Sequence, residues 1–248
     1  MDRRLTFNEE VINYEKHRPK YCRELFDSII EYAQLNEKKK AIEVGIGTGQ
    51  ATTPILKTGC SLTAIELGDN LASYSKVKFK EYDNFRICNI AFEDYKFDNN
   101  SIDLIYSGTA FHWIPEEVGY RKTYEMLRSG GVIALFWNRP FLDNLDIYKE
   151  LQAIDNSPKI GSVLKDKNEI IKAIREYGFI DLQFKLMRQS RKLNAEEYIL
   201  FLNTYSAYIS MENIVKEKLN AEIQNVINRY GGNVIIHDTI DLYLAKKP

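Results

Sequence analysis

The sequence has few cysteines, the residues that are typical of disulfide-rich proteins and of many zinc sites. Its 248 residues contain three cysteines, Cys22, Cys60 and Cys88, which are scattered and odd in number. This spacing predicts neither a disulfide framework nor a C-x-x-C zinc site. No other cluster of metal ligands is visible, so we predict reduced thiols and no bound metal.

Long apolar runs and a strong net charge are also missing. No run approaches the roughly 18 apolar residues of a membrane-spanning helix, and no apolar segment follows the charged start Met1–Leu5, so we expect no secretory signal. The formal net charge of -1 offers no general basic field for nucleic acid. We predict a cytoplasmic protein with no membrane and no nucleic-acid partner; its oligomeric state cannot be predicted.

What the chain does contain is a strand-like run that opens into a glycine-dense loop. Ala41–Val44 precedes the loop Gly45–Gly49, which reads G-I-G-T-G, and Glu43 stands before the first glycine. Such a junction offers a ligand bare backbone N–H groups. The dinucleotide fingerprint needs glycine where Gln50 stands, and no Gly-Lys-Ser/Thr follows for a P-loop. A carboxylate here suits a cationic ligand better than a pyrophosphate.

Alternating strand and helix patterns extend from residue 41 to residue 137. Four further strands are predicted, at 62–66, 85–89, 102–107 and 132–137. Helices between them imply right-handed βαβ units in a parallel sheet, whose ligand crevice lies beyond the carboxyl ends of the strands. The residues expected there are Glu43, the glycine loop, Glu66, Ala91, Phe92 and Ser107.

Capping residues and glycines predict where several of these helices begin or end. Asp69 or Asn70 is expected to cap a helix that runs to about residue 79, and Gly130-Gly131 to stop a helix over 115–127. Lys38–Lys40 is expected to be a solvated turn.

The last hundred residues depart from simple alternation. Helices are predicted at 143–154 and 168–177, an extended segment at 180–187, and then two helices at 195–205 and 211–230. Val234 to Leu244 alternates as a final strand, with Asp238 as the exception to the pattern and His237 as a structural residue. Two strands are therefore split by a helical insert of roughly 40 residues, which is too long for a plain connection.

The glycine loop with its two acids resembles the class I methyltransferases that depend on S-adenosylmethionine (SAM). The run Phe111-His112-Trp113 after the fourth strand is similar to the small-molecule branch, methyltransferase type 11 and the trans-aconitate methyltransferase-like enzymes. The likeness covers residues 10 to 140 well and extends more weakly to the end. It implies a Rossmann-like, doubly wound α/β fold with a mostly parallel seven-stranded sheet, helices on both faces, an N-terminal lid and a helical insert near the C-terminus.

The same resemblance implies one methyltransferase domain over residues 1–248. Residues 1–35 would form the lid and first helix, 36–140 the SAM-binding core, and 141–248 the C-terminal half of the sheet, with the insert at about 191–231. SAM would be the cofactor and S-adenosylhomocysteine the product.

The expected cofactor contacts follow the strand ends. The glycines would approach the methionine part of SAM, Glu43 would hold its ammonium group directly or through water, and Glu66 would accept the ribose hydroxyls. Ala91 stands where many relatives carry an acid, which leaves backbone contact and Phe92 packing for the adenine. The full set of expected cofactor-binding residues is Glu43, Gly45, Gly47, Thr48, Gly49, Glu66, Leu67, Ala91, Phe92 and Ser107.

The acceptor residues are less constrained by the sequence. His112 is a candidate general base, because the pKa of an unperturbed histidine lies near neutrality, and a structural role for it is the competing interpretation. Arg18 and Arg139 suit an anionic acceptor, although the segment around Arg18 also fits a surface cap. The expected acceptor-binding residues are Tyr14, His17, Arg18, Trp113, Asn138 and Arg139.

The sequence thus predicts a methyltransferase without a metal that acts on a small molecule, with a carboxylate as the favoured acceptor. Methylation of ring carbon in a quinone precursor is also compatible with the aromatic residues. Three alternatives stay open: methylation of nucleic acid or protein, a catalytically silent SAM-binding protein, and an NAD-dependent oxidoreductase, which would share the fold and Glu66.

Overall fold

A computed structural model describes residues 3–154 and 165–248. The chain divides into two compact units. The core unit comprises Lys20–Trp137, Leu164–Met187 and Ile240–Pro248. The helical unit comprises Met1–Pro19, Asn138–Val163 and Arg188–Thr239, so each unit is assembled from segments far apart in the sequence.

One seven-stranded sheet has the order β3-β2-β1-β4-β5-β7-β6. The pairs β2–β3, β1–β2, β1–β4 and β4–β5 are parallel. Gly130 donates to the carbonyl of Lys247, and Lys247 donates back to Gly131, so the end of the last strand runs against the start of β5. The predicted mostly parallel, seven-stranded α/β sheet is confirmed. The strands are β1 Lys40–Val44, β2 Ser61–Glu66, β3 Phe85–Asn89, β4 Ile102–Gly108, β5 Leu127–Leu142, β6 Ile180–Asn194 and β7 Asn233–Lys246.

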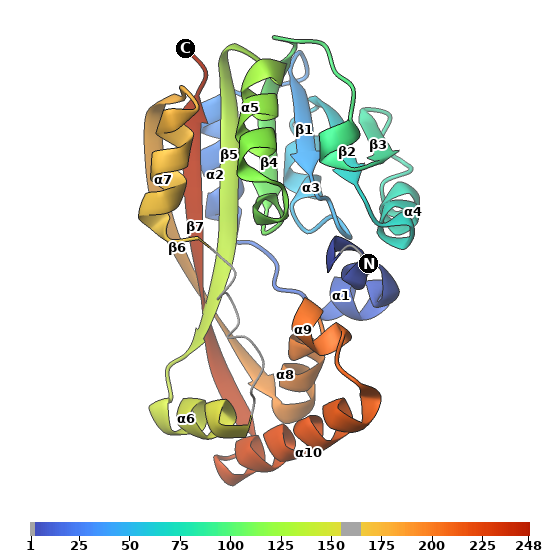
Figure 1. Cartoon of the computed structure of the whole chain (residues 1–248), viewed down its shortest axis with the longest axis vertical. Coiled ribbons are helices and arrows are strands. Elements are labelled where there is room, and N and C mark those ends of the chain that lie inside the picture. Colours follow the sequence, from blue (N-terminus) through green and yellow to red (C-terminus); the bar gives the residue numbers. More distant parts are fainter. Residues whose placement is uncertain (1–2, 155–164) are drawn as a thin grey trace. The chain divides into compact units, whose positions relative to one another are not determined.

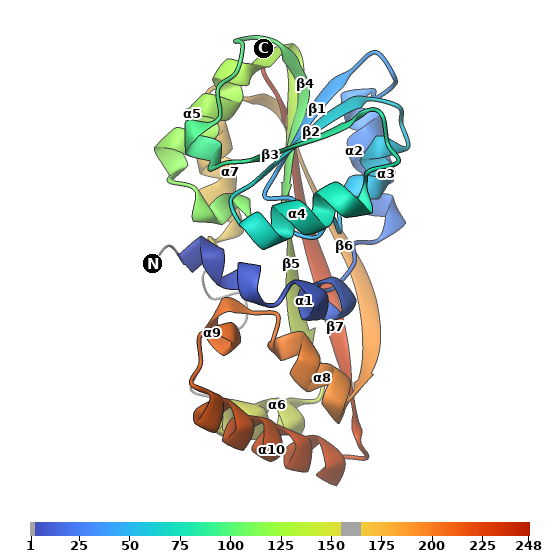
Figure 2. The ribbon, with the colours of Figure 1, turned by 90° about the vertical axis from the view of Figure 1, so that its right-hand side faces the viewer.

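Helices cover both faces of the sheet in the core unit (Figures 1 and 2). One face packs on α2 and α3, where Leu25, Phe26, Ile29 and Ala33 form the buried side of α2 at helical spacing. The opposite face packs on α5 and α7. Strands buried on both sides explain the apolar runs in the sequence. The elements are α2 Arg23–Ala33, α3 Thr52–Leu56, α4 Asp69–Lys78, η2 Phe92–Asp94, η3 Phe111–Trp113, α5 Glu116–Met126 and α7 Lys167–Glu176.

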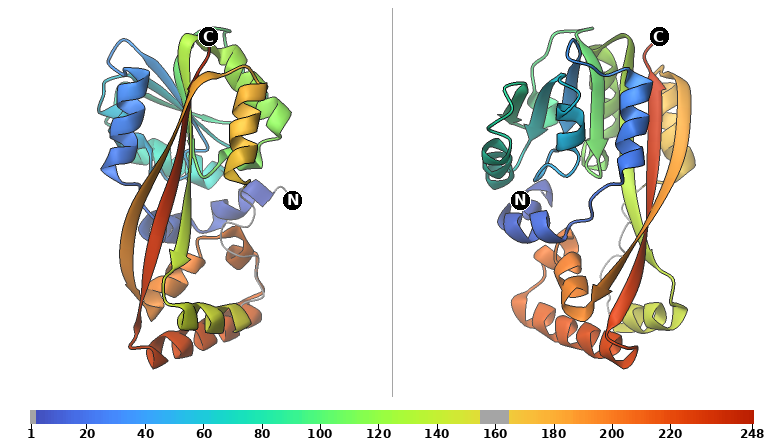
Figure 3. Two further views of the ribbon diagram at one scale, coloured as in Figure 1. Left: turned by 90° about the vertical axis from the view of Figure 1, so that its left-hand side faces the viewer. Right: turned by 180° about the vertical axis from the view of Figure 1, so that it is seen from behind.

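The helical unit has its own apolar core. Helix α10 packs against α6 and α8 (Figure 3). The buried side chains of these helices form one cluster with Val234 and Ile236 of β7. Capping boxes begin α8 at Asn194 and, in the core unit, α7 at Asp166. The remaining helices are η1 Arg3–Glu9, α1 Val11–His17, α6 Leu145–Ile154, α8 Ala195–Leu202, α9 Ser206–Ile209 and α10 Asn213–Arg229.

Several predicted boundaries were wrong. The strands predicted over 132–137 and 180–187 are longer than expected, since β5 spans Leu127–Leu142 and β6 spans Ile180–Asn194. Helix α5 ends at Met126, because Leu127 is already extended and pairs with Ile102, so Gly130-Gly131 lies inside β5 instead of ending the helix. Gly68, not Asp69 or Asn70, is the N-cap of α4. The helix predicted over 195–205 ends at Leu202, and a separate helix, α9, follows.

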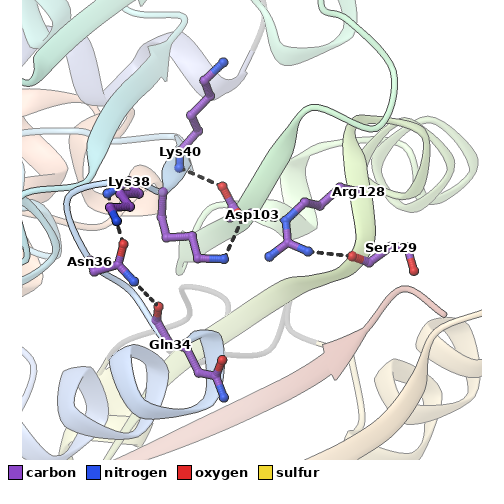
Figure 4. A network of polar contacts seen from close by, with 8 residues as sticks. Gln34, Asn36, Lys38, Lys40, Asp103, Arg128 and Ser129 are labelled. Carbon is purple, nitrogen blue, oxygen red and sulfur yellow. Dashed lines mark hydrogen bonds and ion pairs between the residues drawn. The ribbon is translucent and has the colours of Figure 1, made fainter.

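A polar network ties the amino ends of β1 and β4 together (Figure 4). The carboxylate of Asp103 accepts hydrogen bonds from Lys39 Nζ at 3.1 Å, from the Lys40 N–H at 2.9 Å and from Arg128 Nε at 2.5 Å. Burial alone would raise the pKa of Asp103, but these bonds outweigh it and lower the pKa below its ordinary value. Lys39 is therefore an ion-pair partner and not part of a solvated turn.

Across the described ranges, no helix combines the length and the hydropathy needed to cross a bilayer.

Candidate active site

Close backbone packing shapes the glycine loop at the carboxyl end of β1. Gly45 and Gly49 have φ of 72° and 84°, in the left-handed region that disfavours other residues. A Cβ at Gly49 would lie 2.3 Å from the Phe79 ring, and one at Gly45 would lie 2.5 Å from the Cβ of Ala110. The loop therefore needs glycine at both positions for space as well as for conformation.

Side chains of helix α4 donate hydrogen bonds to carbonyl groups of the glycine loop. Ser75 Oγ donates to the carbonyl of Gly47, and Lys78 Nζ donates to the carbonyl of Thr48, both at 2.8 Å. The hydroxyl of Thr48 accepts a hydrogen bond from Gln50 Nε2 at 2.5 Å, and Thr48 itself is fully buried. Ser75 and Lys78 were not predicted as site residues, since an exposed lysine and a helix serine carry no motif.

Glu66 lies beside the loop at the end of β2. Its Oε2 accepts from the Gly47 N–H and its Oε1 accepts from the Gly68 N–H, both at 2.9 Å. The side chain is 7% exposed, and burial raises its pKa against the opposing effect of the N–H groups of Gly68, Gly47 and Leu67. A carboxylate oxygen accepts more than one hydrogen bond, so both oxygens keep capacity for a neighbouring hydroxyl.

Glu43 is buried below the loop at 2% exposure. Its Oε2 accepts from Thr52 Oγ1 at 2.7 Å and from the Tyr106 hydroxyl at 2.8 Å. Burial raises the pKa of Glu43 to about 7, even though both hydrogen bonds lower it. A carboxyl group in this position gains from a nearby cation, which would favour its ionised form.

This buried carboxyl makes stability depend on pH. The unfolded chain releases the Glu43 proton near 4.5, whereas the folded chain holds it to about 7. The folded state thus binds more protons in this window, and stability falls as the pH rises through it, by about 3 kcal/mol. Glu43→Gln, which is neutral at every pH, should remove that slope. Urea unfolding of both proteins at pH 5 and pH 8 measures it; parallel pH dependences would contradict the expectation.

The third and fourth strand ends contribute mainly packing. Ala91 is the N-cap of the short helix η2, and Phe92 is buried among the apolar residues of the α5 face. Ser107 is fully buried, and its hydroxyl donates to the Val44 carbonyl at 2.8 Å. The Ser107 side chain therefore fastens β4 to β1, which leaves its backbone for any ligand contact.

His112 is held by a neighbouring tryptophan. Trp137 Nε1 donates to His112 Nδ1 at 3.2 Å, and the rings of His112 and Trp113 lie 5.0 Å apart. Since Nδ1 accepts this bond, a neutral His112 carries its proton on Nε2. The geometry favours the structural interpretation of His112 over the general base, because the lone pair that a base needs is already engaged.

The helical unit places Arg18 between two tyrosines. Its guanidinium carbon lies 5.4 Å from the ring centre of Tyr14 and 4.4 Å from that of Tyr205, and Nη1 donates to Thr204 Oγ1 at 3.3 Å. Arginine faces over aromatic rings are energetically favourable contacts. His17 is the last residue of α1, immediately before Arg18.

Asn138 and Arg139 continue β5 into the helical unit, where Asn138 Nδ2 donates to Asp238 Oδ1 at 3.0 Å. Asp238 is fully buried and also accepts from Arg191, at 2.5 Å from Nε and 3.2 Å from Nη2. Burial raises the pKa of Tyr205 to about 12, with Arg18 lowering and Asp238 raising it, so both charged groups lie within electrostatic range of Tyr205.

Sequence reasoning missed Arg191, Asp238 and Tyr205. The signal for Asp238 was present, because an acid broke the apolar alternation of the last strand. Its partner could not be found, since Arg191 lies 47 residues away on β6 and only the pairing of β6 with β7 brings the two together.

The sheet order, the glycine loop and the two acids at adjacent strand ends define the class I, SAM-dependent methyltransferases. Residues 42–135 match the family model described as a methyltransferase domain. We identify it as a SAM-dependent methyltransferase.

Relatives with known sequences agree with this class. An uncharacterized methyltransferase of Schizosaccharomyces pombe is 25% identical over 224 residues, which cover 90% of this chain and 87% of the relative. The trans-aconitate 2-methyltransferase of Deinococcus radiodurans is 29% identical over 99 residues, which cover 39% of this chain and 36% of that enzyme.

A solved structure shows the same fold. The phosphoethanolamine N-methyltransferase 2 of Haemonchus contortus, in complex with phosphomonomethylethanolamine and S-adenosylhomocysteine, superposes with a TM-score of 0.61 at 14% identity. The match covers 97% of this chain and 57% of that one, so this chain spans little more than half of its length.

Proposed function

We propose that this methyltransferase transfers the methyl group of SAM to a small molecule, with a carboxylate oxygen as the favoured acceptor. The observation that carries the donor side of the proposal is the Glu66 carboxylate, which bonds to the N–H of Gly47 inside the glycine loop at 2.9 Å. Acids before and beside the loop suit a ligand with an ammonium group and a ribose, and they disfavour the phosphates of NAD.

The cofactor roles are divided among the strand ends. Glu66 would accept the ribose hydroxyls, Glu43 would sit toward the ammonium group, and the N–H groups of the glycine loop would receive the methionine part. Ala91 and Phe92 would border the adenine through backbone and packing. The side chains of Thr48 and Ser107 are buried and hydrogen-bonded, so these residues would contribute through the backbone, as would Leu67.

The acceptor assignment rests on the helical unit. Arg18 presents a guanidinium between two aromatic rings, which suits a carboxylate or another planar anion. The relative that methylates trans-aconitate acts on an acid, in agreement with this chemistry. Asn138, which donates to the buried Asp238, and its neighbour Arg139 lie on β5 and would add polar contacts to the acceptor.

Bound SAM supplies an electrophilic methyl group on a sulfonium, whose departure leaves a neutral thioether. The protein therefore has to align the acceptor and exclude water. A carboxylate acceptor needs no general base, which fits a His112 whose Nδ1 already accepts from Trp137. Trp113 lies in η3, shortly after the end of β4, and would border the acceptor.

Calorimetry tests the donor half of the proposal, the binding of SAM, and a methylation screen tests the acceptor half, the transfer to a small carboxylate. Titration with SAM and with S-adenosylhomocysteine should show binding of both, and the absence of binding by either would refute the donor half. Labelled SAM should then transfer its methyl group to members of a carboxylate pool. Transfer to nucleic acid or protein alone would refute the acceptor half and leave the donor half standing.

The hydrogen bond from Lys78 of α4 to the glycine loop predicts an effect on ligand affinity. Lys78→Met removes the ammonium group that binds the Thr48 carbonyl and lies 5.4 Å from the centre of the Phe79 ring, and it keeps an unbranched side chain of similar length. Loss of this charge-assisted bond should weaken S-adenosylhomocysteine binding about tenfold. Lys76→Met, an exposed position on the same helix, is the matched control. Equal affinities of the two variants by calorimetry would rule out a positioning role for Lys78.

A further inference from the structure

Three strands of the helical unit bring a serine, a histidine and an aspartate into one chain of hydrogen bonds. Ser190 lies on β6, His237 on β7, and Asp143 directly after β5. Ser190 Oγ is 2.8 Å from His237 Nδ1, and His237 Nε2 is 3.0 Å from Asp143 Oδ2. None of the three belongs to the methyltransferase motifs.

The donors and acceptors in this chain follow from the aspartate. An ionised carboxylate only accepts hydrogen bonds, so His237 Nε2 carries the proton that Asp143 receives. Nδ1 of a neutral His237 is then a lone pair, and the Ser190 hydroxyl donates to it. The hydrogen bond from His237 also lowers the pKa of Asp143, which keeps that carboxyl ionised. A nucleophile, a base and an orienting group are therefore in the order that activates a hydroxyl.

The surroundings fix the imidazole and favour an anionic reactant. The ring of Phe141 stacks on His237, with centres 5.2 Å apart and planes at 27°. Arg188 and Lys192 flank Ser190 at alternate positions of β6, so the three share one face of the strand. All three are exposed, and within the described ranges neither cation forms an ion pair.

We propose that Ser190 is a site of covalent acylation by small anionic acyl donors, the acyl phosphates. The Ser190 oxygen forms the bond to the acyl carbon while its proton passes to His237 Nδ1. The bond between the acyl carbon and the phosphate oxygen breaks, and phosphate leaves and takes up the proton. Asp143 stabilises the imidazolium, and Arg188 and Lys192 hold the phosphate. The product is an ester of Ser190, and no oxidant or reductant is needed.

Acetyl phosphate and peptide mass spectrometry test the proposal on the full chain. Ser190 should gain an acetyl group about 100-fold faster than Ser73, an exposed serine of α4 that serves as the internal control, because a positioned general base contributes at least that factor. Asp143→Asn should reduce the Ser190 rate at least tenfold and leave Ser73 unchanged. Equal rates at Ser190 and Ser73 in the unaltered chain, or acetyl on His237 with none on Ser190, would overturn the proposal.

A second acyl donor separates the effect of the base, His237, on the rate from the effect of the two cations, Arg188 and Lys192. With p-nitrophenyl acetate, which is neutral, the preference for Ser190 should persist, since it depends on His237. Replacement of both Arg188 and Lys192 by Gln should slow the acetyl phosphate reaction and not the ester reaction. If the double variant slows neither donor, the assignment to acyl phosphates is wrong.

Discussion

Replacement of Glu66 by alanine should lower the affinity for S-adenosylhomocysteine by about 100-fold. The expected loss corresponds to two hydrogen bonds between the ribose hydroxyls and a charged acceptor. Glu66 also binds the N–H groups of Gly47 and Gly68, so the variant loses support for the loop as well. Isothermal titration calorimetry gives the affinity, and circular dichroism reports whether the fold is kept.

A ligand without the ribose hydroxyls separates these two effects. The 2′,3′-dideoxy analogue of S-adenosylhomocysteine should bind the unaltered protein much more weakly than the parent compound, whereas Glu66→Ala should bind both alike. Asp69→Ala removes an exposed acid three residues further on, and it should change neither affinity. A folded Glu66→Ala protein that still prefers the ribose hydroxyls would show that another group binds them.

Asp238→Ala should destabilise the protein by about 3–5 kcal/mol, the usual cost of leaving one partner of a buried ion pair alone. Asp238 is fully buried, and the side chain of Arg191 is 21% exposed, so little water is available to solvate the guanidinium that remains. Asn138 would lose its acceptor in the same step. Urea unfolding, followed by a signal from the helical unit, measures the change.

The double variant Asp238→Ala, Arg191→Met tests the cause. Removing both charges takes away the unpaired cation, and it should restore most of the lost stability, because apolar replacement of a buried pair is often close to neutral. A double variant that is as unstable as Asp238→Ala would place the loss in packing or in the Asn138 contact.

Much of the core unit could be predicted from local pattern. β3 spans the predicted residues 85–89, and β1, β2 and β4 each differ from prediction by one residue at one end. Strands buried on both faces are continuous apolar runs in the sequence, which makes them easy to predict. The glycine loop was evident because its spacing and its leading acid are properties of adjacent residues. Glu66 followed from strand order, which places the ends of neighbouring parallel strands at one edge.

Other features could not be predicted from the neighbouring residues in the sequence, because they depend on contacts with distant ones. The early end of α5 depended on the pairing of Leu127 with Ile102, which is a contact between strands. The part played by Lys39 depended on Asp103, 64 residues away. The bond from Trp137 to His112 Nδ1, which supports the structural role for His112 over the general base, joins residues 25 positions apart.

The sequence by itself determined the fold class, the glycine loop and the acids that precede and follow it, because periodicity, glycine spacing and strand ends are written in short stretches of chain. Only the tertiary structure decided what those groups are paired with. It gave Glu43 the hydrogen-bond donors Thr52 and Tyr106. It bonded the glycine loop to Ser75 and Lys78 of α4, and it paired Asp238 with Arg191. It also brought Ser190, His237 and Asp143 into one chain of hydrogen bonds. Each of these depends on side chains far apart in sequence, whose proximity is set by strand order and helix packing.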